Sequence, residues 1–600
     1  MKPTPSLSLI GLAVSALIAG CASSGGSTPS VANPYSSSGG SALGEVHVNT
    51  MRVFGDSYSD PNFTSSVGTI NWATQMQARG TVTKSDIYAI GGARASYGEA
   101  RAFDRQISNW EGRGTGIADG DLTVVYLGHN DMGRNGSPDN NLTNAKKGYS
   151  DGVNRLIAAG AASDNRRLFV TQLHDWGRAP GVAPLASKQV IGWNNYIASV
   201  ANATPNVIAV DMYTVFQRIF TDPAKYGFTN VSTADPSRSA IDALFNDATH
   251  FGNRGQDIIT RVYQHYLTRG WDWANSVSAG ADAAGRINQD IDNSTLVLSM
   301  AEQKALKPGF RLVPLGMQTQ QPLSFSPRNS KVFQPFANTQ KGNASAPSGL
   351  ALDMNLGSEN NASSSRVGVA VFQQDQAKYL STSALRNSKQ FTSDAVSLYW
   401  NKPVSGWVLS SQLSHLDLNF SGNAQDEMVQ RTLDNNSKGN TWSFENKLRY
   451  PMRSGMFSVT PWMSLTSQSH TLDPALTSTL YTTDVMFSSN RVNEWLTGVG
   501  VDVQADPIAL DGQKQLQFGG SLHHVSSLSR DSVTVSMQES GTPGVVQREI
   551  FPLAKVERTQ LGLQAALSVA KNLQFTATYG TQLQDVKHTS SLMVKAHVRY

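Results

Sequence analysis

Residues 51–60 read MRVFGDSYSD, a short apolar run that ends abruptly at Gly55. Two interpretations are open for the residues that follow. Gly, Asp and Ser are common turn residues, so Asp56 and Ser57 could simply close a strand. Alternatively, Ser57 is a nucleophile displayed at the end of a buried strand. The rest of the chain must decide between a turn and a reactive site.

The composition indicates more than one domain and a surface that is partly hidden from water. The 600 residues exceed what a single hydrophobic core usually holds. Charged residues make up only 16% of the chain, below the roughly 25% usual in soluble domains. The net charge of +4 is small for this length, and we therefore expect no nucleic acid among the partners.

The beginning of the chain predicts an export signal followed by a tether. Residues 1–21 have a basic start, an apolar stretch and small residues before Cys21, as in a secretory signal peptide. Cys21 is the only cysteine, so no intramolecular disulfide can form. The sequence IAGC resembles a bacterial lipobox, which implies lipidation of Cys21; a plain signal peptide is the alternative. Residues 22–48 are rich in Ser, Gly, Asn and Pro and predict a flexible linker.

Residues 49–275 alternate short apolar runs with helical patterns. The apolar runs show little alternation between buried and exposed positions, which suits strands covered on both faces. Strands that alternate with helices predict a parallel sheet between helical layers. In such sheets function lies at the carboxyl ends of the strands, and Ser57 follows the first run at that end. The runs are MRVF, DIYAI, LTVVYL, RRLFVTQL and NVIAVDMY.

Between about residue 331 and residue 600 the hydrophobic period changes to two. In the last stretch, SSLMVKAHVRY, apolar residues occupy every second position from Leu592 to Tyr600. About twelve such stretches occur, each near the ten residues expected of a membrane-spanning strand, with Trp or Tyr near several of their ends. Closure of these strands would leave no unpaired edge. They predict a 12-stranded antiparallel transmembrane β-barrel; a large soluble β-sandwich is the alternative.

The two halves are joined by residues 276–330, which we expect to form a linker. Within it, NSTLVLSMAEQKALK at 293–307 has helical character, and Asn293 or Ser294 is suited to cap its beginning. Taken alone, this pattern predicts a soluble connector helix.

Two motifs directly follow the second and third apolar runs of the first half. The paired glycines of YAIGGARAS, residues 88–96, allow a backbone N–H to approach a ligand closely. In YLGHND, residues 126–131, Asn130 can place a side-chain amide donor over a reacting carbonyl. Each motif, taken alone, is more typical of an ordinary turn.

A third motif, DATH at residues 247–250, supplies an acid and an imidazole. The spacing lets Asp247 reach the His250 ring and fix its tautomer, which leaves the other ring nitrogen for a serine proton. Serine is a poor nucleophile at neutral pH and needs such a base beside it. Because D-x-x-H is common by chance, this motif indicates a catalytic site only in combination with the other three.

GDS, GG, GxND and DxxH occur in this order, the first three directly after expected strands. The set resembles the GDSL family of esterases and lipases, also called SGNH hydrolases. This resemblance implies a flavodoxin-like α/β/α domain that hydrolyses carboxylic esters. It implies that Ser57 is the nucleophile, His250 the general base and Asp247 its partner. It also implies an oxyanion hole made by the Ser57 N–H, the Gly92 N–H and the Asn130 side chain.

The chain departs from the family pattern at three positions, none of which removes a catalytic group. Tyr58 follows Ser57 where the family often has leucine. Ile87 opens the second motif where asparagine is frequent, so a supporting hydrogen bond is expected to differ. Phe251 follows His250 where proline is frequent.

Other chemistries find little support in the sequence. It contains no G-x-S-x-G, H-E-x-x-H or P-loop motif. His129, His174 and His265 lack the spacing of metal ligands, and we expect neither a metal nor a cofactor. The run HDWGRAP at 174–180 follows the fourth apolar run and either lines the rim of a cleft or is a structural loop.

The carboxyl-terminal half resembles an autotransporter translocator of Gram-negative bacteria. This resemblance implies that the helical segment at 293–307 threads the barrel, with a soluble connector as the alternative. The two resemblances imply a serine esterase or lipase anchored in the outer membrane by residues 331–600, with its hydrolase domain exposed at the cell surface. The implied partners are an ester or lipid substrate, outer-membrane lipid and the barrel-assembly machinery. The alternative is a surface adhesin or biofilm protein that uses the hydrolase fold mainly for binding.

Overall fold

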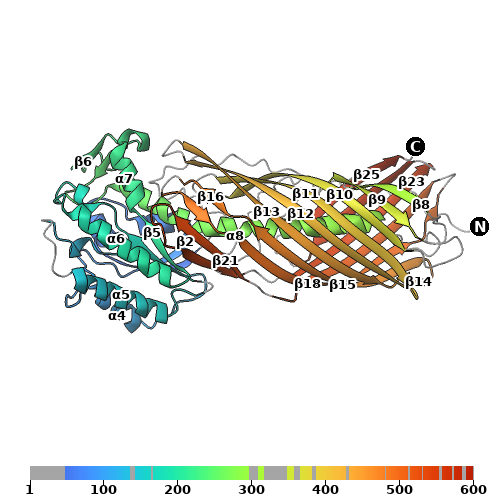
Figure 1. Ribbon diagram of the computed structural model, residues 1–600, viewed down its shortest axis with the longest axis horizontal. Helices are drawn as coiled ribbons and strands as arrows, with labels where there is room; N and C mark the ends of the chain where they lie inside the picture. The colour runs from blue at the N-terminus through green and yellow to red at the C-terminus, as the bar shows by residue number, and fades with distance from the viewer. Residues whose placement is uncertain are drawn as a thin grey trace, which may run out of the picture.

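Figure 1 shows an elongated molecule with an α/β domain at one end, a large antiparallel sheet at the other, and one long helix that enters the sheet. Cys21, the signal peptide and the tether lie outside the described residues, so the interpretations of these segments stay predictions. The computed structural model describes residues 48–134, 142–163, 166–295, 309–315, 348–356, 365–381, 387–426, 431–479, 482–510, 514–529, 532–552, 557–570, 573–583 and 590–598.

The amino-terminal domain is built on a five-stranded parallel sheet with the order β2-β1-β3-β4-β5. This is the strand order of flavodoxin-like folds, as predicted. The three strands β3, β4 and β5 are buried along their whole lengths, because the domain covers both faces of the sheet. The strands are β1 (Val48–Gly55), β2 (Val82–Ile87), β3 (Leu122–Tyr126), β4 (Arg167–Gln172) and β5 (Val207–Asp211).

Helices pack in pairs around this sheet, α3 against α8 and α4 against α5. Gly152 of α5 permits one of these close approaches, since a Cβ at this position would lie 2.4 Å from the ring of Phe103 on α4. The helices are α2 (Pro61–Ser66), α3 (Trp72–Ala78), α4 (Phe103–Gly112), α5 (Leu142–Ala158), α6 (Ala186–Ala203), α7 (Tyr213–Thr221) and α8 (Asn253–Thr295), and a small sheet of β6 (Asn230–Ala234) and β7 (Ala243–Phe245) lies outside the main one.

The carboxyl-terminal half is dominated by an antiparallel sheet with the order β25-β24-β23-β20-β18-β15-β13-β12-β11-β10-β9-β8. This path has twelve strands, and the short β14 and β19 pair with β15 and β20. The strands are β8 (Gly309–Leu315), β9 (Ser348–Asn355), β10 (Arg366–Ser381), β11 (Asn387–Val404), β12 (Trp407–Asp426), β13 (Arg431–Arg449), β14 (Met452–Ser454), β15 (Phe457–Leu472), β18 (Asn490–Ala505), β19 (Ile508–Ala509), β20 (Gln515–Ser527), β23 (Glu557–Ala570), β24 (Leu573–Gln582) and β25 (Ser590–Val598).

The strand predictions from residue 348 onward each coincide with a strand of this sheet. The stretch KVFQPFANTQ, residues 331–340, lies outside the described residues. β8 joins the sheet from within the segment that the sequence assigned to the linker. Its Pro314 is atypical of a central strand, but β8 lies at one end of the strand order, where proline is tolerated. β11, β12 and β13 have 18, 20 and 19 residues, so they extend beyond the roughly ten residues that cross a bilayer.

Side chains alternate between the two faces of these strands, and one face exposes a row of apolar residues. In β10, Val367, Val369 and Val371 are 41%, 44% and 50% exposed, whereas Ala370 and Phe372 between and beyond them are buried. A soluble protein rarely exposes such a continuous row of branched apolar residues. The pattern is that of a barrel whose outer face contacts lipid.

Helix α8 begins three residues after His250 and connects the two halves. It lies against β8, β10, β12, β13 and β15, so the sheet curves around the second part of the helix (Figure 1). There Asn288 donates to Ser443 Oγ at 3.1 Å and Asp292 accepts from Gln412 at 2.7 Å. No helix among the described residues is long and apolar enough to span a membrane.

The helix that enters the sheet therefore starts well upstream of the one that the sequence predicted at residues 293–307, most of which lie outside the described residues. α8 also runs through residue 275, where the sequence placed the end of the hydrolase domain. The early part of this helix packs on the parallel sheet. Its apolar residues therefore continue the helical pattern of the first domain, and the sequence gives no sign that the same helix extends into the barrel.

A four-stranded sheet lies between the two halves, with the order β16-β17-β21-β22 (Figure 1). β22 lies against β5 and α6 of the first domain. Two buried ion pairs cross this interface: Arg167 of β4 with Glu549 at 3.2 Å, and Arg269 of α8 with Glu539 at 2.7 Å. The strands are β16 (Ala475–Thr477), β17 (Val485–Phe487), β21 (Ser532–Glu539) and β22 (Gln547–Pro552).

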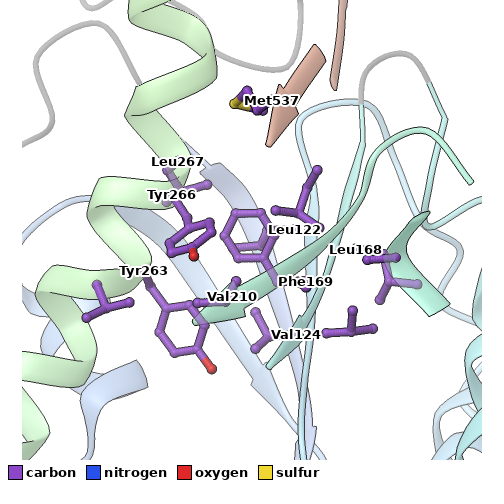
Figure 2. Close-up of a cluster of buried hydrophobic side chains, with 14 of the residues drawn as sticks. Leu122, Val124, Leu168, Phe169, Val210, Tyr263, Tyr266, Leu267 and Met537 are labelled. Carbon is purple, nitrogen blue, oxygen red and sulfur yellow. The ribbon is translucent and has the colours of Figure 1, made fainter. Parts of the chain in front are cut away.

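The two halves also share hydrophobic packing. Figure 2 shows Tyr263 and Tyr266 of α8 beside Phe169 of β4, with Met537 of β21 at the edge of the same cluster. The rings of Phe169 and Tyr263 are stacked with their centroids 6.3 Å apart. Met537 is buried, so a residue of the carboxyl-terminal half completes the core of the amino-terminal domain.

Candidate active site

The site lies where β1 and β3 end side by side. Gly55, the last residue of β1, is paired with Tyr126, the last residue of β3. A Cβ on Gly55 would lie 2.6 Å from the Tyr126 carbonyl oxygen, a distance that real Cβ atoms do not adopt. The strand therefore ends in glycine because no larger residue fits between the two strands, and the chain then turns through Asp56 to Ser57.

The structure brings Ser57, His250 and Asp247 together in one hydrogen-bonded row. His250 Nε2 is 2.8 Å from Ser57 Oγ, and His250 Nδ1 is 2.8 Å from Asp247 Oδ2. Asp247 Oδ1 accepts from the backbone N–H groups of Thr249 and His250, at 2.8 Å and 2.7 Å. Ser57 and His250 are only 6% and 8% exposed. The acid, the imidazole and the hydroxyl are thus already in contact.

The charge of Asp247 sets the tautomer of His250. Burial raises the pKa of the Asp247 carboxyl, but hydrogen bonds from the His250 ring and from the backbone N–H of Thr249 outweigh this and lower it to about 2. An ionised carboxylate can only accept at His250 Nδ1, so Nδ1 carries the proton and Nε2 is free to accept from Ser57. The centroid of the Phe63 ring lies 4.4 Å from that of the His250 ring, and this contact further restricts the orientation of the imidazole.

Gly91 and Gly92 differ in what their N–H groups do. The Gly91 N–H donates to Asp60 Oδ2 at 2.9 Å. Gly92 has a φ of 79°, which favours glycine. Among the described residues, neither the Gly92 N–H nor the Ser57 N–H has a hydrogen-bond acceptor. Of the two glycines, Gly92 is therefore the one whose backbone N–H could donate a hydrogen bond to a substrate.

Asn130 and Asp131 hold the glycine turn against the end of β3. One N–H of the Asn130 amide donates to the Ala93 carbonyl at 3.0 Å, which leaves the second N–H of that amide. The carboxylate of Asp131 accepts from the backbone N–H groups of Ala95 and Ser96, at 2.8 Å and 3.1 Å. Sequence reasoning missed Asp131, although it directly follows Asn130 in the same motif.

Asp56 and His129 join the turn after β1 to the turn after β3. His129 Nδ1 lies 3.0 Å from Asp56 Oδ2, and both residues are almost fully buried. Asp56 also accepts from the Tyr58 N–H at 3.1 Å. His129 was considered in the sequence only as a metal ligand, whereas its contact with Asp56 ties the Ser57 turn to the Asn130 turn.

The HDWGRAP run contributes buried side chains. His174 is completely buried, with Nε2 3.1 Å from the Tyr58 hydroxyl, and Trp176 is 3% exposed. Both belong to the packing behind the site, as the structural-loop alternative requires. Within the described part of the chain, no group of three or more His, Cys, Asp or Glu side chains could hold a metal ion.

The fold and the site together define a hydrolase-type α/β domain carried by an antiparallel barrel. Residues 52–262 match the model of the GDSL-like lipase/acylhydrolase family, and residues 342–580 match that of the autotransporter beta-domain. The chain therefore combines a GDSL-type hydrolase domain with an autotransporter beta-domain. Such a beta-domain anchors the chain in the outer membrane and exposes the hydrolase domain at the surface.

Several solved structures are similar to the carboxyl-terminal half. The beta domain of the Bordetella autotransporter BrkA is 15% identical, with 42% of this chain and 88% of that chain covered and a TM-score of 0.27. The translocator domain of NalP from Neisseria meningitidis is 9% identical, with 42% and 79% covered and a TM-score of 0.31. The transport unit of AIDA-I from Escherichia coli is 12% identical, with 42% and 82% covered and a TM-score of 0.25. No curated protein matches the chain.

Proposed function

We propose that this protein is a serine esterase or lipase that hydrolyses carboxylic esters at the surface of the outer membrane. The observation that supports the proposal most is the row of contacts from Ser57 Oγ through His250 to Asp247, with 2.8 Å at both hydrogen bonds. A hydroxyl, an oriented imidazole and an ionised carboxylate in this order are what nucleophilic ester hydrolysis requires.

In the proposed reaction, Ser57 Oγ attacks the ester carbonyl carbon while His250 Nε2 accepts the serine proton. The ionised Asp247 stabilises the imidazolium that forms. His250 then donates its proton to the leaving alkoxide, the alcohol departs, and an acyl-serine ester remains. A water molecule attacks this ester with His250 again as the base, and the carboxylic acid is released with Ser57 restored.

The negative charge on the substrate oxygen would be held by three donors. The proposed donors are the Ser57 N–H, the Gly92 N–H and the second N–H of the Asn130 amide. The first two have no acceptor within the described part of the chain, and Gly91 is disfavoured because Asp60 already accepts its N–H. Donors that need no reorganisation stabilise the transition state most effectively.

The proposal places the substrate outside the cell, as an ester or a lipid, and leaves the barrel as the anchor. It also includes the predicted signal peptide, lipidation of Cys21, and insertion by the barrel-assembly machinery. Radiolabelled palmitate tests Cys21 directly: label should enter the wild type and should not enter Cys21→Ser.

The test of the function is hydrolysis of a panel of p-nitrophenyl esters by the full-length protein in outer-membrane fractions. Ser57→Ala should lower turnover roughly 10⁴- to 10⁶-fold, because the residual rate comes from the oxyanion site and binding alone. Ser66→Ala is the matched control, since this serine of α2 lies on the surface and its hydroxyl donates to the Phe63 carbonyl. Near wild-type turnover in Ser57→Ala would contradict the proposal and favour an adhesin, whose binding would survive the substitution.

A further inference from the structure

Tyr58, the residue after the nucleophile, has no part in the proposed reaction but lies directly behind it. Its side chain is 1% exposed, and its ring centroid is 5.3 Å from that of His250. The Tyr58 hydroxyl donates to the backbone carbonyl of Thr249, the residue before His250. The turn that carries Ser57 and Tyr58 is therefore connected to the segment that carries His250 by a second hydrogen bond, in addition to the Ser57–His250 contact.

Two more hydrogen bonds extend this contact into the core. His174 Nε2 lies 3.1 Å from the Tyr58 hydroxyl oxygen, and His174 Nδ1 lies 2.9 Å from the Tyr126 hydroxyl. A carbonyl can only accept, so the single proton of the Tyr58 hydroxyl is used at Thr249. The Tyr58 oxygen must then accept from His174 Nε2–H, and His174 Nδ1 must accept from the Tyr126 hydroxyl. In the row Tyr126–His174–Tyr58–Thr249, each proton therefore has a single possible position.

The surroundings keep these protons in place. His174 and Tyr126 are completely buried. Burial lowers the pKa of His174 well below its ordinary value, and the neighbouring imidazoles of His129 and His250 lower it further. Burial raises the pKa of both Tyr58 and Tyr126 well above the ordinary value for tyrosine. His174 therefore stays neutral and the two hydroxyls keep their protons, as the row requires.

The Thr249 carbonyl is an effective point at which to hold His250. It belongs to the peptide bond whose N–H is that of His250, and this N–H donates to Asp247 Oδ1 at 2.7 Å. The Thr249 N–H donates to the same oxygen at 2.8 Å. One peptide plane is thus fixed on its carbonyl side by Tyr58 and on its N–H side by Asp247. Rotation of this plane would move the His250 ring relative to Ser57.

We propose that Tyr58 is a positioning residue: its hydroxyl, oriented by His174 and Tyr126, holds the Thr249–His250 peptide so that His250 Nε2 meets Ser57 Oγ. This inference rests on the proposed esterase function. Leucine, which the family often has at this position, has no donor and cannot make the contact. The substitution by tyrosine thus adds a constraint on the base from the nucleophile's own neighbour.

The experiment compares Tyr58→Phe with Tyr263→Phe in the full-length protein. Tyr263 is also fully buried, and its hydroxyl bonds to Thr171 Oγ1 at 2.8 Å, so the same atom is removed from the same domain without a link to Thr249. Tyr58→Phe should lower kcat for a p-nitrophenyl ester roughly 10- to 100-fold with little change in KM, because a slightly misplaced base affects the chemical step. Tyr263→Phe should leave kcat near the wild-type value.

Tyr126→Phe tests the far end of the row and keeps the inference falsifiable if Tyr58→Phe does not fold. Without the Tyr126 hydroxyl, His174 can move its proton to Nδ1, and Nε2 then competes with the Thr249 carbonyl for the Tyr58 proton. Tyr126→Phe should therefore lower kcat by a smaller factor than Tyr58→Phe, with KM again unchanged.

Thermal unfolding of the same variants separates positioning from a general loss of structure. Tyr58→Phe and Tyr263→Phe should have similar unfolding temperatures but different kcat values. Equal kcat in these two variants, or a wild-type kcat in Tyr126→Phe, would overturn the inference while the loss of activity in Ser57→Ala still upheld the esterase function. Full activity in Ser57→Ala would instead refute the function itself.

Discussion

The two halves of the molecule treat the same apolar residues in opposite ways. In the first, Val124, Val170 and Val210 lie in strands of the parallel sheet and are completely buried by protein. In the second, Val396 and Leu398 of β11 are 50% and 53% exposed. Both arrangements keep apolar side chains out of water, the first by covering helices and the second by the acyl chains of a bilayer. Exposure in itself therefore says little until the solvent at that surface is known.

Polar groups differ between the halves in a corresponding way. In the hydrolase domain they gather at the carboxyl ends of β1 and β3, where a parallel sheet leaves an opening between its connections. In the barrel they line the inner face, where Asp292 of α8 accepts from Lys447 and Arg449 at 3.0 Å and 2.5 Å. The polar groups of the first half meet at the proposed catalytic site, whereas those of the second contact the helix inside the barrel.

The largest effect should come from breaking the contact between the halves. Arg167→Met removes one partner of the buried pair with Glu549 and should cost roughly 3–5 kcal/mol of stability, because it leaves a carboxylate buried without its partner. Lys147→Met is the control, since its pair with Asp151 is exposed to solvent and contributes little to stability. Chemical denaturation followed by residual esterase activity measures both. Equal losses would mean that the interface is not stabilised by its ion pairs.

A slightly smaller effect is expected within the site. Asn130→Ala should cost roughly 2.7–4 kcal/mol of transition-state stabilisation, a hundred- to a thousandfold in kcat. The loss should fall on kcat because the donor acts on charge that develops in the transition state. Steady-state kinetics decides this, and a change confined to KM would place Asn130 in substrate binding. The barrel should remain unaffected, with normal outer-membrane fractionation.

The comparison of the two surfaces can be tested with one substitution on each. Leu398→Arg, on the outer face of β11, should destabilise the barrel by up to roughly 2–4 kcal/mol if the residue lies near the bilayer midplane. Ile191→Arg, on α6 of the hydrolase domain, starts from a similar exposure of 48% but faces water and should be nearly neutral. Heat-modifiable gel migration reports the barrel. Equal tolerance of arginine at both positions would contradict the lipid-facing assignment.

The smallest effect should appear as a pH dependence at the contact between the halves. Burial raises the pKa of Asp211 to about 6, and the nearby Glu539 of β21 raises it too. Its folded-state pKa thus exceeds the unfolded value of about 3.9. In the folded state Asp211 keeps its proton up to a higher pH than in the unfolded state. This group should therefore lower the stability of the fold as the pH rises from about 4 to about 6. Asp211→Asn should flatten that part of the stability curve, and an unchanged slope would count against the raised pKa.

The period of apolar residues predicted both kinds of sheet, because it records directly which faces of a strand meet water. It did not reveal β8, whose seven residues include Pro314, or the small sheet that contains β21. In β21, Val535 and Met537 alternate with polar residues and are buried, and α8 packs against this strand. The alternation in SVTVSM is a local strand signal that the sequence analysis did not use, whereas its packing against a helix distant in the chain leaves no such signal.

The residues proposed for catalysis were predictable because each follows a strand or belongs to a compact motif. Ser57, Asn130 and the Asp247–His250 spacing are all visible in short stretches of sequence. The supporting contacts were not, since the Tyr58–Thr249 hydrogen bond joins residues 191 positions apart. Tyr58 appeared in the sequence only as a departure from the family pattern. Its hydrogen-bond partners, Thr249 and His174, could be identified only from the three-dimensional structure.

The most direct test of the central claim is labelling of intact cells with a membrane-impermeant fluorophosphonate, which reacts with activated serines. We expect the full-length protein in the outer membrane to be labelled without permeabilisation, because Ser57 lies in a domain exposed at the surface. Label should be lost in Ser57→Ala and retained in Ser66→Ala. Persistent label in Ser57→Ala would contradict the nucleophile, and label that appears in the wild type only after permeabilisation would contradict the display of the enzyme by its own barrel.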